Sequence, residues 1–139
     1  LLEAVVAVPI PEKSRVLFEK PVVVSLVTVM PDGQPQATPV WIDYDGEYLR
    51  VNTARGRQKD KNMQRDARVT VLAIDPENPY FWVEVRGRVA EVTEEGGVDH
   101  INALSLKYRG DADYYGRNAA QKDKETRVIY KIEPLHVTP

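Results

Sequence analysis

Positive charge is concentrated in residues 53–62, TARGRQKDKN, around a single glycine. Between Arg55 and Arg68 the chain carries six basic residues and two acidic ones, a local balance of +4, although its formal net charge is −2. The stretch follows a strand-like run and precedes a short helical pattern. Free backbone N–H groups and the positive end of the helix dipole would therefore join the cationic side chains at one point. This combination predicts a binding site for an anion.

Two residues of this stretch favour a ligand over a merely solvated charged surface, which is the usual meaning of a charge run. Gly56 lies between Arg55 and Arg57, where a flexible backbone lets N–H groups approach an anion. Thr53, at the end of the preceding strand-like run, adds a hydroxyl donor of the kind that phosphate oxygens accept.

Side-chain catalysis and metal binding find little support in the sequence. The two histidines, His100 and His136, stand far apart without an acidic cluster around either, so we expect no metal site. No Ser/His/Asp set, nucleophile elbow, phosphate-binding loop or dinucleotide fingerprint occurs. Glu94 and Glu95 form a pair of carboxylates, but at an expected helix start, where acids favour the dipole. An anion site with little catalytic apparatus suggests a bound cofactor that carries the chemistry itself.

Composition narrows the class of protein. A chain of 139 residues fits one domain with a real core, and we expect residues 1–10 to be peripheral. A pI near 5.7 argues against general nucleic-acid binding. The absence of cysteine removes disulfides and thiolate chemistry and fits a reducing compartment. No apolar run approaches the roughly 20 residues of a membrane span, and residues 1–8 lack a basic leader. We therefore expect a soluble, cytoplasmic protein.

Strand patterns dominate the chain. The first three should form an antiparallel meander, because turn residues at 31–33 and an Asp45-Gly46 pair separate them. Gly87 suggests a bulge or a close backbone approach, and Pro134 suits an edge or a bend. The expected strands cover residues 22–30, 36–44, 47–53, 68–74, 80–93 and 127–137.

Helical patterns are fewer, at residues 11–20, 57–65 and 94–108, whereas residues 109–121 are polar and rich in turn formers. Six strands joined mostly by short turns predict a mostly β fold, a small antiparallel barrel in a single domain spanning residues 1–139. The strand-helix-strand alternation of a doubly wound fold is missing.

Aromatic residues leave two interpretations open. Trp41 and Trp82 lie in expected strands, where packing in the core is the usual role of a large ring. Alternatively, one of them lines a pocket for a flat conjugated ring. Tyr114 and Tyr115 in the polar loop could close such a pocket or simply pack on the surface.

Four motifs together resemble the split β-barrel superfamily of pyridoxamine 5'-phosphate oxidase. They are PDGQPQ at 31–36, TPVW at 38–41, GRQKDKNM at 56–63 and VEVRGRV at 83–89, in the same order as in the family. The sequence is most similar to the actinobacterial branch of flavin/deazaflavin oxidoreductases, whose members use coenzyme F420. The similarity runs from about residue 17 to residue 137, although residues 109–126 match only loosely.

The resemblance implies a Greek-key-like, FMN-binding type of split barrel and a homodimer with two cofactor sites at its interface. In that arrangement Arg57 and Lys59 hold the cofactor's phosphate. The segment Pro39-Val40-Trp41 lies along the ring system, and Arg127 reaches the cofactor or substrate of the other subunit. The supporting residues around the phosphate are Thr53, Arg55, Gly56, Lys61 and Asn62.

The charge count favours F420 over FMN, because four basic side chains across residues 55–61 suit a phosphodiester with a tail of several carboxylates better than a single phosphate. We expect an F420-dependent oxidoreductase that transfers a hydride between the reduced deazaflavin and a small organic acceptor. No catalytic side chain is assigned, with Tyr114 and Tyr115 as candidate proton donors. The alternatives are an FMN-dependent enzyme resembling pyridoxamine-phosphate oxidase and a flavin- or F420-binding protein without turnover. A small nucleic-acid-binding barrel is disfavoured by the acidic remainder of the chain.

Overall fold

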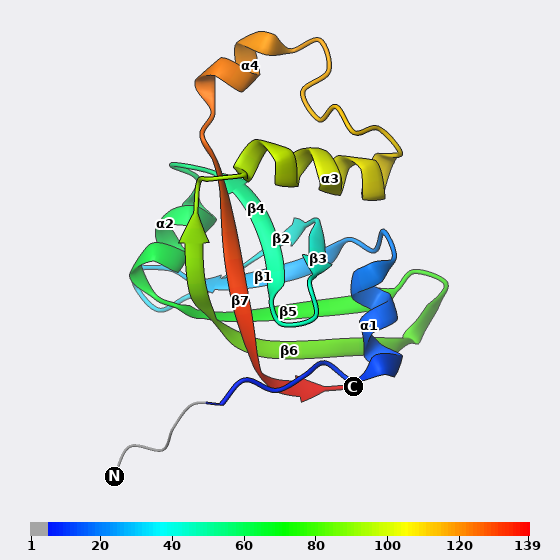
Figure 1. Ribbon diagram of the computed structural model, residues 1–139. Coiled ribbons are helices and arrows are strands. Elements are labelled where there is room, and N and C mark those ends of the chain that lie inside the picture. Colours follow the sequence, from blue (N-terminus) through cyan, green and yellow to red (C-terminus); the bar gives the residue numbers. More distant parts are fainter. Residues whose placement is uncertain (1–5) are drawn as a thin grey trace.

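Seven strands form one antiparallel sheet that curls into a split barrel, with four helices around it (Figure 1). The computed structural model describes residues 6–139. The strands follow the order β2-β1-β5-β6-β7-β4-β3, so β2 and β3, neighbours in the chain, form the two opposite edges. The strands are β1 (Val24–Val29), β2 (Pro35–Val40), β3 (Ile42–Tyr44), β4 (Leu49–Ala54), β5 (Arg68–Asp75), β6 (Asn78–Thr93) and β7 (Arg127–Thr138).

The expected mostly β split barrel is confirmed, but the expected meander of the first three strands is wrong. Residues 36–44 do not form one strand, because the chain breaks at Trp41 and its two halves pair with different partners. Ile42 pairs with Val51 of β4 but not with β1: its N–H donates to the hydroxyl of Tyr108 (3.2 Å) and its carbonyl accepts from Lys107 Nζ (2.6 Å). Side chains from a helix thus replace the neighbouring strand at this corner.

The interior of the barrel is a continuous apolar cluster drawn from both ends of the chain. Leu26, Ile42, Val71, Val85 and Ile132 are fully buried and come from five different strands. Alternation along the strands supplies them, since every second residue of a strand points to the same face. Burial of this apolar area is the main force that holds the sheet closed.

Three helices cover the barrel, α1 (Glu12–Glu19), α2 (Gln58–Arg65) and α3 (Gly97–Arg109), whereas α4 (Ala119–Lys124) buries no residue and stands away from it (Figure 1). Helices α1, α2 and α3 lie close to the expected positions. Helix α1 buries Leu17 and Phe18, whereas α3 lies above the ends of β4 and β7 (Figure 1). Helix α4 was not predicted. Asn118 caps it by accepting a hydrogen bond from the backbone N–H of Gln121 (3.1 Å).

Gly87 and Pro134 lie at an irregularity between β6 and β7, as the sequence indicated. The pairing of β6 with β7 shifts register between Arg86 and Gly87, where a Cβ at Gly87 would lie 2.5 Å from the carbonyl oxygen of Glu133. Pro134 pairs with Gly87 at this irregularity, beyond the stretch of β7 that pairs with β4, so its missing N–H interrupts no ladder there.

The N-terminal segment is tied to the barrel before α1 begins. The N–H of Val8 donates to the carbonyl of Pro134 (2.9 Å), and Ile10 is fully buried. The part of the expected periphery that falls on residues 1–5 lies outside the described residues. Between residues 6 and 139 no helix has the length and apolar character that crossing a membrane requires.

Candidate functional site

One cavity of about 310 Å³ lies where the Trp41 corner, the start of α2, helix α3 and the start of β7 meet. It has an apolar wall, supplied by the strand that leads to Trp41 and by α3, and a basic wall, supplied by two segments far apart in sequence. Its lining residues are Val23, Pro39, Val40, Trp41, Asn52, Arg57, Lys59, Ile101, Leu104, Tyr114 and Arg127.

Three cations form the basic wall. Arg57 and Lys59 stand at the start of α2, placed there by the turn at Gly56, whose φ of 91° favours glycine. Arg127 begins β7 and is only 4% exposed. Burial, together with the charges of Arg57 and Arg127, lowers the pKa of Lys59 below its usual value. Among the described residues no carboxylate lies within ion-pair distance of Lys59, so this wall carries uncompensated positive charge.

A single carboxylate, Glu125, stands behind the two arginines. Its Oε1 accepts from Arg57 (3.2 Å) and its Oε2 from Arg127 (3.0 Å). Burial alone would raise the pKa of Glu125, but hydrogen bonds from Tyr115 and Gln121 and the nearby arginines hold it below its usual value. Glu125 is therefore ionised at neutral pH and fixes both guanidinium groups.

Aromatic side chains that contact one another border the cavity. The indole of Trp41 stacks on Tyr108, with ring centroids 5.3 Å apart, and meets Tyr114 edge to face at 5.9 Å. The guanidinium groups of Arg109 and Arg127 lie 5.3 Å and 4.8 Å from the centroid of the Tyr114 ring. Such cation–π contacts and stacking fix the rings in place, so the apolar wall is rigid and suits a flat ligand.

Within residues 6–139, three buried side-chain oxygens on β2 and β4 lack hydrogen-bond partners, and one of them belongs to a residue of the cavity lining. Thr38 Oγ1, Asn52 Oδ1 and Thr53 Oγ1 are each shielded from solvent and have no hydrogen-bond partner among the described residues. Thr38 precedes the lining residues Pro39 and Val40, and Asn52 itself lines the cavity. Because an unpaired buried polar group costs about 1–3 kcal/mol, the unpaired Oδ1 of Asn52 in the lining is typical of a site that a ligand or water completes.

The structure brings together most, but not all, of the residues that the sequence singled out. Seven of them line the cavity: Pro39, Val40, Trp41, Arg57, Lys59, Tyr114 and Arg127. Gly56 and Thr53 are each adjacent in sequence to a lining residue.

The remaining residues have other surroundings. Arg55 pairs with Asp60 (3.0 Å) and Glu94 (2.9 Å), away from the cavity lining. Asn62 is fully buried and donates to Thr28 Oγ1 (3.0 Å). Lys61 is exposed. Tyr115 lies behind the lining, where its hydroxyl donates to Glu125 (2.8 Å) and accepts from Arg127 (3.0 Å).

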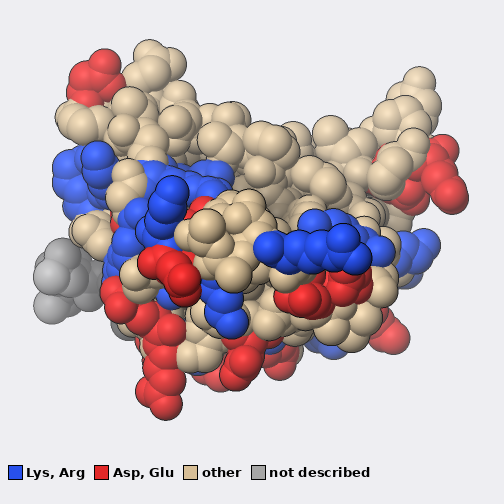
Figure 2. Space-filling view, turned by 90° about the horizontal axis from the view of Figure 1, so that it is seen from above, with Lys and Arg blue, Asp and Glu red and all other residues tan. Residues whose placement is uncertain are grey.

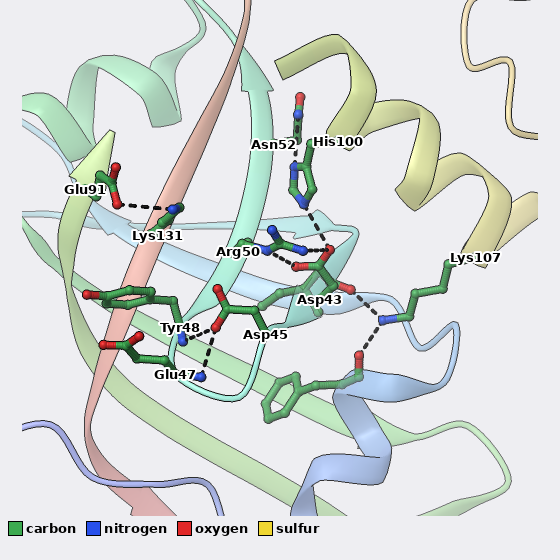
Figure 3. Close-up of polar contacts among 12 residues, drawn as sticks. Asp43, Asp45, Glu47, Tyr48, Arg50, Asn52, Glu91, His100, Lys107 and Lys131 are labelled. Carbon is green, nitrogen blue, oxygen red and sulfur yellow. Dashed lines mark hydrogen bonds and ion pairs between the residues drawn. The ribbon is translucent and has the colours of Figure 1, made fainter. Parts of the chain in front are cut away.

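Sequence reasoning missed a polar network under α3. His100 Nε2 lies 3.0 Å from Asp43 Oδ2, and Arg50 grips the same carboxylate at 2.8 Å and 2.9 Å (Figure 3). One carboxylate, that of Asp43, thus lies beside His100 in space, a pairing that the sequence did not indicate. Burial alone would raise the pKa of Asp43, but the hydrogen bonds from His100 and Arg50 lower it.

This network positions Asn52 at the cavity. Asn52 Nδ2 donates to the carbonyl of Gly97 (2.8 Å) and contacts His100 Nδ1 (3.2 Å), so Nδ1 is the acceptor and Nε2 carries the proton toward Asp43. No local signal singled out Asn52, because Arg50 and Thr53 of β4 are polar as well. Ile101 and Leu104, which are buried apolar residues of α3, gave none either.

The molecular face that carries α3 and α4 has both positively and negatively charged side chains. Figure 2 shows basic side chains next to carboxylates on this face, and a broad region without charged side chains across the upper part of the view. Within residues 6–139, no three His, Asp or Glu side chains converge as metal ligands would.

The family model described as pyridoxamine 5'-phosphate oxidase matches residues 10–139. A solved structure named F420 reductase is 33% identical and has a TM-score of 0.80, with 93% of this chain and 98% of that chain covered.

Two further solved structures share the fold at lower identity. A conserved hypothetical protein from Mycobacterium tuberculosis is 23% identical, with a TM-score of 0.69 and coverage of 99% of this chain and 88% of that one. HupZ of Group A Streptococcus is 16% identical, with a TM-score of 0.61 and coverage of 92% and 91%.

Proposed function

Because the chain belongs to the pyridoxamine 5'-phosphate oxidase family, a family of flavin-related oxidoreductases, we propose that it is an F420-dependent reductase acting on a small organic acceptor. The observation that carries the proposal is the cavity itself. Three cations with one shared carboxylate stand at one side, and a fixed tryptophan stands at the other. A ligand with an anionic tail and a flat ring matches both sides.

The residues present fit such a cofactor. Arg57, Lys59 and Arg127 supply charge-assisted donors for a phosphate, which are the strong kind of hydrogen bond. The segment that ends in Trp41 supplies the apolar surface for the ring. The unpaired side-chain carbonyl of Asn52, a residue of the lining, is buried here, as expected where a ligand supplies the missing partner.

F420 fits the charge distribution better than FMN. FMN carries one phosphate, whereas F420 carries a phosphodiester and a tail of several carboxylates. The exposed Lys61, one turn beyond Arg57 on α2, continues the basic surface outward from the cavity. A longer anionic tail could use this extension, and the 33% identity to a structure named F420 reductase supports the same choice.

The chemistry of hydride transfer is supplied by the reduced deazaflavin when it is bound. The protein's own part is to bind, orient and shield. Burial of the Trp41 corner under α3 excludes water from one face of the ring site. Of the two candidate proton donors, Tyr114 lines the cavity, and its hydroxyl accepts from Arg127 (3.1 Å). We therefore assign proton delivery to the Tyr114 hydroxyl rather than to Tyr115.

A homodimer is part of the proposal. On the outer face of the sheet Ile74 and Trp82 form a cross-strand pair that is 44% and 39% exposed, and Tyr80 on the same strand is 91% exposed. Large exposed apolar side chains in neighbouring positions favour a protein interface. Sedimentation of the wild type and of Trp82→Arg tests this surface. A dimer that the substitution dissociates supports it, and a wild-type monomer contradicts it.

Turnover tests the function directly. Purified protein is mixed with reduced F420 and a panel of electron-poor alkenes and quinones, and oxidation of the cofactor is followed optically. Oxidation above the protein-free rate in at least one mixture supports the reductase. Tight binding of F420 without any turnover across the panel would instead identify a cofactor-binding protein.

A further inference from the structure

Glu125 has an unusual place relative to the cavity. It ends α4 and precedes β7, and its carboxylate is held by four donors: Arg57, Arg127, the hydroxyl of Tyr115 (2.8 Å) and Gln121 Nε2 (3.2 Å). It is not part of the lining, whereas both arginines that it pairs with are. A ligand in the cavity would feel its charge without contacting it.

The charges at this end of the cavity can be counted. Arg57, Lys59 and Arg127 are cations, and within residues 6–139 Glu125 is the single carboxylate at ion-pair distance from any of them. The wall therefore carries a net charge of about +2 rather than +3 while Glu125 is ionised. Its hydrogen bonds and neighbouring arginines, which lower the pKa of Glu125, keep it ionised in neutral solution.

We infer that Glu125 sets the charge selectivity of the cavity. It orients the two guanidinium groups and at the same time subtracts one unit of positive potential from the ligand site. The inference rests on the proposed anion-binding function and adds a property to it, namely a weaker preference for highly charged anions than three cations alone would give. Repulsion between Glu125 and a ligand grows with the ligand's charge, so a more highly charged anion is penalised more than inorganic phosphate.

Glu125→Gln tests the charge of Glu125 separately from its role in holding the two arginines. Glutamine has nearly the same shape and keeps an oxygen that can accept from Arg127 and Tyr115, but it carries no charge. A residue that only held the arginines in place would lose binding on substitution, equally for all anions. A residue that sets charge selectivity gains binding, and gains most for the most highly charged anion.

Glu133→Gln is the matched control. Glu133 also pairs with an arginine, Arg88 Nε, at 2.9 Å, and the side-chain exposures of the two pairs are alike: 41% and 19% for Arg88 and Glu133, against 45% and 15% for Arg57 and Glu125. The substitution makes the same change in net charge, but toward the other end of β7, away from the cavity.

The experiment is calorimetric titration of the wild type and both variants with inorganic phosphate and with pyrophosphate, at low and at moderate salt. We expect Glu125→Gln to tighten phosphate binding by about threefold to fivefold and pyrophosphate binding by more, with the difference shrinking as salt rises. Glu133→Gln should bind both anions as the wild type does. Weaker binding in Glu125→Gln, or an equal gain for both anions, would overturn the inference.

The outcomes also separate this inference from the proposed function. If the wild type binds both anions and Glu125→Gln leaves their ratio unchanged, charge selection by Glu125 is wrong while the anion site stands. If the wild type binds neither anion, the cavity is not an anion site, and both proposals fall.

Discussion

The indole of Trp41 lies flat against the phenol of Tyr108, with ring centroids 5.3 Å apart and an angle of 12° between the ring planes. The Tyr108 hydroxyl accepts from the N–H of Ile42 (3.2 Å) and donates to the carbonyl of Val22 (2.7 Å). One residue of α3 thus stacks on the cavity wall and satisfies the backbone at the break between β2 and β3. The cavity depends on α3 even though few of its lining residues come from that helix.

Two substitutions at Tyr108 should divide these roles. Tyr108→Phe keeps the stack but leaves the buried backbone groups of Ile42 and Val22 unpaired, which should cost about 1–3 kcal/mol of the free energy of unfolding in urea. Tyr108→Leu also removes the stack, so we expect a further loss of about 1 kcal/mol and weaker cofactor binding. Unaltered cofactor affinity in Tyr108→Leu would show that the Trp41 wall does not hold the ligand.

Arg57 and Lys59 should carry most of the affinity for the cofactor. Removing both side chains in Arg57→Ala/Lys59→Ala deletes two charge-assisted contacts, each worth about 1.5–3 kcal/mol, so F420 affinity measured by fluorescence should fall by about 100-fold or more. Arg68→Ala is the control, because Arg68 is 79% exposed and pairs only with Asp66 among the described residues. An unchanged dissociation constant in the double variant would refute the phosphate cradle.

Lys107 predicts a specific dependence of stability on pH. Burial lowers the pKa of Lys107 to about 8, while its Nζ donates to the carbonyls of Phe18 and Ile42. Because an unfolded lysine keeps its proton up to a pKa of about 10.4, the unfolded state binds more protons than the folded state between these values. The free energy of unfolding should therefore rise with pH in this window, by about 1 kcal/mol after allowance for solvent screening at this half-buried site.

Urea unfolding of the wild type and of Lys107→Met at about pH 7 and about pH 9.5 measures this effect. The stability of the wild type relative to the variant should increase with pH. Lys122→Met, at an exposed position of α4, should show no such trend. A stability difference between wild type and Lys107→Met that stays constant, or falls, would exclude a buried lysine of lowered pKa.

Gly97 couples α3 to the basic wall. A Cβ at this position would lie 2.5 Å from the carbonyl oxygen of Arg127 and 2.8 Å from its carbonyl carbon. Gly97→Ala should therefore cost about 1–3 kcal/mol in stability and, by displacing Arg127, weaken cofactor binding as well. Gly87→Ala meets the carbonyl of Glu133 equally closely, at 2.5 Å, so it should lose similar stability without losing affinity. Equal affinities in the two variants would contradict the coupling.

Local signals allowed most of the fold to be predicted from the sequence. The Asp45-Gly46 turn, the alternation along the strands and the helical spacing at residues 94–108 place elements close to where they lie. The break at Trp41 could not be predicted, because it depends on side chains of Lys107 and Tyr108 that arrive from α3. Helix α4, a short polar segment, carries too little periodicity to be recognised.

The candidate site could be predicted only in part, because only some of its residues are neighbours in the sequence. The basic stretch is contiguous, so Arg57 and Lys59 stand out, but contiguity does not tell which side chains face the cavity. Glu125 and His100 acquire their roles only through contacts with Arg57 and Asp43, which come from distant parts of the chain. Such long-range polar pairs leave no local pattern.

The choice between F420 and FMN tests the central claim most directly. Titrations of the purified protein with each cofactor, in the same buffer and salt, give two dissociation constants. The basic surface around Arg57 and Lys61 predicts tighter binding of F420, with an advantage that shrinks as salt screens the longer anionic tail. Tighter binding of FMN, or binding of neither cofactor, would contradict the account.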